Sequence, residues 1–87
     1  MDGYISVKMD QQLRDLLDTI FTDEFMKENT NFENFGQFQY SSAVIANWKA
    51  ETMVYSQFLM DRFIKESTRF ESWDGMVKAA ADARFSK

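Results

Sequence analysis

One stretch of the chain occurs twice. Residues 23–35 and residues 61–73 align at an offset of 38 positions, and seven of the thirteen aligned residues are identical. Self-similarity of this kind indicates an internal duplication, and equivalent segments are expected to fold alike. The duplication therefore constrains the architecture more than the activity. The identical pairs are Asp23/Asp61, Phe25/Phe63, Lys27/Lys65, Glu28/Glu66, Thr30/Thr68, Phe32/Phe70 and Glu33/Glu71.

Each copy belongs to a longer amphipathic pattern. Apolar residues recur at i, i+3 and i+4 spacing before the first copy, which predicts a helix from about residue 10 to residue 28 with Asp10 as its N-cap. A wide apolar face between about residues 50 and 66 predicts a second long helix. Residues 1–7 alternate only in part, and we interpret them as an arm that docks on the domain.

The connection after the first predicted helix contains two competing start signals for the next one. Thr30 with Glu33 fits a capping box, whereas Asn34 could itself be the N-cap. The second copy repeats the alternatives, since Thr68 and Glu71 fit the box and Ser72 precedes Trp73. Both copies predict a helix, a short polar connection and another helix.

Residues 35–47 fit either a helix or a strand, because their apolar side chains match both periods. The equivalent residues 73–85 contain three consecutive alanines, which favour a helix. We therefore predict helices in both segments.

The predicted fold is all-α, with four short helices arranged as two duplicated helical hairpins that pack about a pseudo-two-fold axis. Residues 1–87 would form a single helical domain, with repeat 1 over about 10–47 and repeat 2 over about 48–85. Matching phenylalanine and tryptophan side chains should be mostly buried in related positions: Phe25 and Phe63, Phe32 and Phe70, Phe35 and Trp73.

Composition excludes several functions. The chain has no cysteine and no histidine, so it cannot form disulfides or thiolate zinc sites, and it lacks the commonest metal ligand and general base. We predict no enzyme, and we assign no catalytic, cofactor-binding or metal-binding residues. A net charge of −4 disfavours nucleic acid. No apolar run or leader-like segment is present, so we expect a soluble cytoplasmic protein without a membrane contact.

Aromatic residues make up 16% of the chain, which is more than four short helices readily enclose. We expect the surplus at Tyr40, Trp48 and Tyr55 to form a surface patch that binds another protein, most simply a second copy. The predicted function is a small acidic helical protein-interaction module, such as an adaptor, inhibitor or regulator.

Three alternatives remain open. A DNA-binding helical regulator is one, although residues 35–47 contain no Arg or Lys. An inhibitor that mimics nucleic acid through its carboxylates is the second. An enzyme or small-ligand carrier is the third, and it would require a pocket with convergent polar groups.

Overall fold

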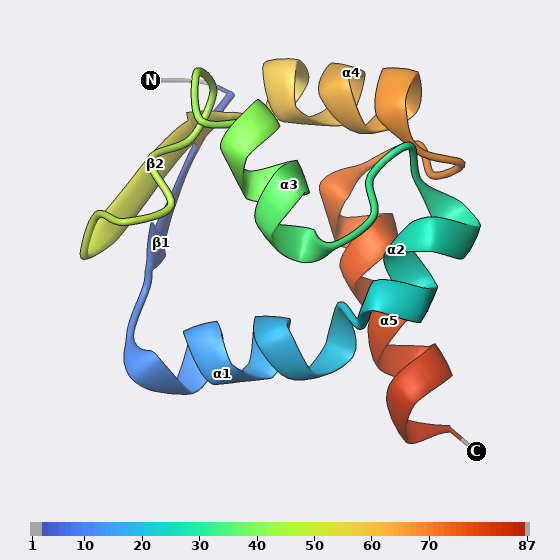
Figure 1. The fold of residues 1–87 in the computed structure, drawn as a ribbon. Helices are drawn as coiled ribbons and strands as arrows, with labels where there is room; N and C mark the ends of the chain where they lie inside the picture. Colours follow the sequence, from blue (N-terminus) through green and yellow to red (C-terminus); the bar gives the residue numbers. More distant parts are fainter. Residues whose placement is uncertain (1–2, 87) are drawn as a thin grey trace.

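A computed structural model describes residues 3–86. They form five helices and one two-stranded antiparallel sheet (Figure 1). The predictions of an all-α fold and of a four-helix bundle are therefore wrong. In chain order the elements are β1 (Tyr4–Lys8), α1 (Gln11–Ile20), α2 (Asp23–Asn29), α3 (Phe35–Ser41), β2 (Thr52–Ser56), α4 (Gln57–Ser67) and α5 (Trp73–Phe85).

The sheet is the main departure from the prediction. β1 and β2 pair in register from Tyr4 opposite Ser56 to Lys8 opposite Thr52. β2 occupies the first part of the predicted helix over residues 50–66, and α4 begins only at Gln57. Residues 52–56 alternate between exposed and buried side chains and include β-branched and aromatic residues, which suit a half-buried strand once a partner strand is present. The predicted arm supplies that partner as β1, and its residues 1 and 2 lie outside the described part.

The predicted helix over residues 10–28 is split in two. Asp10 caps α1 as expected, because its Oδ1 accepts a hydrogen bond from the Leu13 N–H at 2.9 Å. The chain then leaves the helix at Phe21, and the Thr22 hydroxyl accepts from the Phe25 N–H to start α2. The break turns the Phe21 side chain into the core, where it is almost fully buried.

The competing start signals are resolved in favour of the later residue in both copies. Asn34 Oδ1 accepts from the Gln37 N–H, and Ser72 Oγ accepts from the Gly75 N–H. The capping-box prediction for Thr30 and Thr68 is wrong, since these threonines close the preceding helices instead. The Thr30 hydroxyl, for example, donates to the Met26 carbonyl at 2.7 Å.

α3 is shorter than predicted. It ends at Ser41, and turns follow where the helix was expected to continue to residue 47. The buried Ser42 hydroxyl donates back to the Phe38 carbonyl at 2.8 Å and accepts from the Trp48 indole N–H at 2.8 Å. This pair of bonds folds the segment after α3 back over the helix end.

The duplicated segments meet at an isolated antiparallel bridge between Thr30 and Thr68. The helices that lead into this bridge differ, because α4 runs unbroken through positions equivalent to the gap between α1 and α2. The duplicated sequence therefore produces matching contacts around the bridge, but the two copies do not form the same set of helices. Two equivalent backbone hydrogen bonds flank the bridge, from the Asn31 N–H to the Ser67 carbonyl at 2.9 Å and from the Arg69 N–H to the Asn29 carbonyl at 3.0 Å.

The aromatic contacts around the bridge are matched as well. Phe25 stacks near Phe70 with ring centroids 5.7 Å apart, and the equivalent pair, Phe63 and Phe32, stacks at 6.0 Å. Phe25 is buried, whereas the other three rings are half-buried at the edge of the core. The predicted burial is confirmed for Phe25, Phe35 and Trp73 and only in part for the other three rings.

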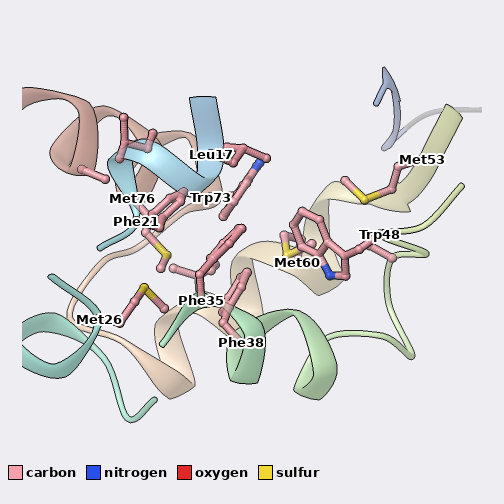
Figure 2. Close-up of a cluster of buried hydrophobic side chains, with 14 of the residues drawn as sticks. Leu17, Phe21, Met26, Phe35, Phe38, Trp48, Met53, Met60, Trp73 and Met76 are labelled. Carbon is pink, nitrogen blue, oxygen red and sulfur yellow. The ribbon is translucent and has the colours of Figure 1, made fainter. Parts of the chain in front are cut away.

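A cluster of aromatic and methionine side chains fills the centre of the molecule (Figure 2). In Figure 1, α1 and α4 run along opposite sides of the molecule, with α3 between them and the sheet at one end. Phe38 is fully buried and lies at the hub of the cluster, with centroid distances of 5.6 to 5.8 Å to five other rings. Flexible methionine side chains fill the remaining gaps. The five rings around Phe38 are Phe32, Phe35, Trp48, Phe63 and Trp73.

Candidate functional site

The three residues predicted to form a surface patch do not share one surface. Tyr40 projects from α3 and is 85% exposed, whereas Trp48 and Tyr55 are each only 6% exposed. Trp48 packs on the rings of Phe35 and Phe38, and Tyr55 points inward from β2. The expectation that the core cannot hold these rings is wrong for Trp48 and Tyr55. Trp48 can be buried because Ser42 accepts its indole hydrogen.

Tyr40 and the edge of Trp48 instead meet in a groove between α3, α1 and the segment before β2. The groove has a volume of about 510 Å³. We call it the Tyr40 groove, and its polar and aromatic walls come from Arg14, Gln39, Tyr40, Asn47, Trp48 and Lys49.

Arg14 builds this groove. Its guanidinium donates three hydrogen bonds to backbone carbonyls: Nε to Met9 at 3.0 Å, Nη1 to Trp48 at 2.7 Å and Nη2 to Ala50 at 3.1 Å. The bonds tie the segment before β2 to the start of α1. Asn47 shapes the same segment, since its Oδ1 accepts from the Lys49 N–H at 3.1 Å.

The Tyr40 groove is electrostatically unlike the rest of the chain. Its lining includes two cations, Arg14 and Lys49, and no acidic residue of the described chain, although the net charge is −4. A guanidinium has five N–H groups, and three of those on Arg14 are used on carbonyls, which leaves two for a ligand. The side-chain amides of Gln39 and Asn47 add further hydrogen-bonding groups. These groups suit a ligand in which a carboxylate lies beside an apolar or aromatic side chain.

No known family model, curated protein or solved structure matches this chain.

Within residues 3–86, acidic side chains do not gather in a group of three or more that could hold a metal ion. None of the helices in this part of the chain is long and apolar enough to cross a membrane.

Sequence reasoning missed Arg14 and Lys49. Arg14 lies outside the apolar face of the helix predicted over residues 10–28, where arginine is ordinary. Its partners at Trp48 and Ala50 lie more than thirty positions away, so no local window contains the contact. Of the three predicted residues, Tyr40 is the one that the structure leaves available for contact.

The hydroxyl of Tyr55 has a raised pKa in the folded protein. Burial raises the pKa of its hydroxyl above the usual value of about 10, and the nearby carboxylates Asp74 and Asp61 raise the pKa further. The folded protein therefore holds this proton more tightly than the unfolded chain does. Stability is unaffected by this group below pH 10 and falls as the pH rises above about 10 toward the pKa of the folded state.

We expect Tyr55→Phe to flatten this alkaline loss of stability, because the variant has no hydroxyl to ionise. Urea midpoints measured from pH 8 to pH 11 by circular dichroism would show it. Tyr40→Phe is the matched control, since Tyr40 is exposed, and it should follow the wild type. Parallel curves for wild type and Tyr55→Phe would contradict the prediction.

Proposed function

We propose that the protein is a small acidic interaction module of the cytoplasm that binds an acidic segment of a partner protein in the Tyr40 groove. The observation that carries the proposal is the pairing of an exposed tyrosine with two cations, Arg14 and Lys49, in one groove of about 510 Å³. Tyrosine and arginine are the side chains most often found at the energetic centre of protein interfaces.

Charge decides which partner fits. A groove lined by two cations and no described acidic residue favours a carboxylate-bearing segment over a basic one. The acidic remainder of the chain repels the extended phosphate backbone of a nucleic acid, which needs many cationic contacts. A short acidic peptide requires only the local charges of the groove.

The position of the tyrosine supports a peptide rather than a flat interface. Tyr40 projects beside the groove while Trp48 forms part of its wall. An apolar side chain of the partner would therefore pack on the Tyr40 ring while a neighbouring carboxylate reaches Arg14 or Lys49. Arg14 is already held in place by three backbone carbonyls, so binding does not have to order it.

Selection from a library of random peptides tests the proposal. We expect the wild-type protein to enrich peptides that carry Asp or Glu next to an aromatic or aliphatic residue. Tyr40→Ala and Lys49→Glu should each weaken an enriched peptide about tenfold or more in fluorescence anisotropy, which corresponds to about 1.4 kcal/mol. Binding should also weaken as salt is added.

Lys65→Glu is the control, since it makes the same charge change at an exposed site on α4 outside the groove. If Lys65→Glu and Lys49→Glu lost the same peptide affinity, the loss would come from the change in net charge. That result would overturn the assignment of the binding site to the groove. Enrichment of basic peptides, or of none, would also overturn it. Two further experiments test the alternatives: sedimentation reports self-association, and titration with duplex DNA reports nucleic-acid binding.

A further inference from the structure

A second cavity opens between the inner face of the sheet, α1 and α5. Its volume is about 280 Å³. For comparison, an apolar cavity of about 150 Å³ is large enough to take up benzene, so this one accommodates a somewhat larger molecule. We call it the Trp73 cavity, and its walls are mainly apolar, from Val7, Leu13, Leu17, Met53, Trp73 and Val77.

One polar group inside these walls has no partner. Trp73 is 8% exposed, and the hydrogen bond that it donates within residues 3–86 comes from its backbone N–H and not from its indole N–H. The same residues contain no side-chain nitrogen or oxygen that is both fully enclosed and unpaired, so this N–H must border open space. The other tryptophan differs, because the Trp48 N–H is bonded to Ser42 at 2.8 Å.

The Trp73 ring is held in a fixed orientation. The centroids of Phe21, Phe38 and Trp48 each lie 5.6 Å from that of Trp73. Its own backbone N–H donates to Asp61 Oδ1 at 3.1 Å. Figure 2 shows the indole nitrogen on the side of the ring next to Leu17, which lines the same cavity. The donor therefore lies beside a residue of the cavity wall before any ligand arrives.

The charges at the rim limit the ligand's chemistry. Asp74 and Lys78 border the cavity from α5, and both are exposed. A buried carboxylate would lose its hydration against the apolar walls and approach Asp74, while a buried ammonium would face the indole donor rather than an acceptor. A neutral molecule avoids both costs.

We propose that the Trp73 cavity binds a small, neutral, mostly apolar molecule whose hydrogen-bond acceptor meets the Trp73 indole N–H. Carbonyl compounds about the size of a fused bicycle fit this description. The apolar walls supply most of the affinity, and the indole sets the ligand's orientation. Trp48 lines both this cavity and the Tyr40 groove, but the proposal does not depend on the function proposed for that groove.

The probes are 1-indanone, which carries a carbonyl acceptor, and indane, which has nearly the same shape without one. The chain has two tryptophans, so an amide NMR spectrum contains two indole N–H signals to follow. We expect 1-indanone to shift the Trp73 signal saturably and downfield and to affect the Trp48 signal less. Indane should bind about 3- to 10-fold more weakly, because it cannot accept the hydrogen bond.

Two variants locate the site. Val77→Phe adds a ring to the wall and should abolish binding, whereas Val44→Phe makes the same change at an exposed position away from the cavity and should not. Trp73→Phe keeps a ring without the donor, so its binding is followed through the backbone amide signals of the cavity walls. It should bring 1-indanone down to the affinity of indane, which provides a test if Val77→Phe fails to fold. No saturable shift up to the solubility limit, or equal affinities for the two probes, would overturn the proposal. Unchanged binding by Val77→Phe would do so as well.

Discussion

Phe38→Ala is expected to lower the free energy of unfolding by about 3–5 kcal/mol, the usual cost of truncating a buried phenylalanine. Phe38 is fully buried and lies within 5.8 Å of five other rings. Its removal leaves a cavity that the stacked neighbours cannot fill without losing their own contacts. Because a whole domain is stable by only about 5–15 kcal/mol, the variant should be largely unfolded or close to it.

Urea unfolding followed by circular dichroism measures this effect. Phe58→Ala is the matched control, since Phe58 lies on α4 and is 70% exposed, and its unfolding midpoint should stay near that of the wild type. The unfolding midpoint of Phe38→Leu should lie between those of Phe38→Ala and Phe58→Ala. A Phe38→Ala midpoint equal to that of Phe58→Ala would show that the aromatic cluster is not the stabilising core.

Arg14→Ala is expected to cost about 1.5–3 kcal/mol, the range for hydrogen bonds from a charged group. Two of its three bonds, to the Trp48 and Ala50 carbonyls, hold the segment before β2 against α1, and the third is to the Met9 carbonyl. Arg14→Lys should recover little of the loss, because an ammonium is a point donor that cannot reach three carbonyls set around a planar fork. Amides in residues 42–51 should also exchange faster with solvent.

The control for this prediction is Arg62→Ala. Arg62 forms an exposed ion pair with Glu66 at 3.3 Å on the surface of α4, and such pairs contribute about 0–1 kcal/mol. A loss for Arg14→Ala no larger than that for Arg62→Ala would mean that the segment is held by other contacts. Full stability of Arg14→Lys would show that the charge alone is sufficient.

Local signals predicted the parts of this fold that depend on neighbouring residues. The N-cap at Asp10 and the helix over residues 73–85 each rest on contacts within one helical turn. The caps at Asn34 and Ser72 were one of the two alternatives that the sequence left open. The duplication correctly indicated that Phe25 and Phe63 would make matching contacts, although it could not show which rings face them.

The errors share a physical cause, which is a partner far away in the sequence. Residues 52–56 resemble part of an amphipathic helix until β1 is available to pair with them. Likewise, Trp48 and Tyr55 counted as surplus aromatics because the features that permit their burial become apparent only in three dimensions. Ser42 accepts the indole hydrogen of Trp48, and Tyr55 lies on the buried face of β2. The Tyr40 groove depends on Arg14 in the same way.

The pairing of β1 with β2 also affects how the protein is made. At ribosomal rates of about 5–20 residues per second, the interval between synthesis of Lys8 and of Thr52 is about 2–9 s. For that time β1 has no partner strand, while α1, α2 and α3 are being synthesised. Ser6 and Lys8 alternate with its apolar residues and keep the waiting strand hydrated. β1 therefore takes its place in the sheet only after the three helices that follow it have been made.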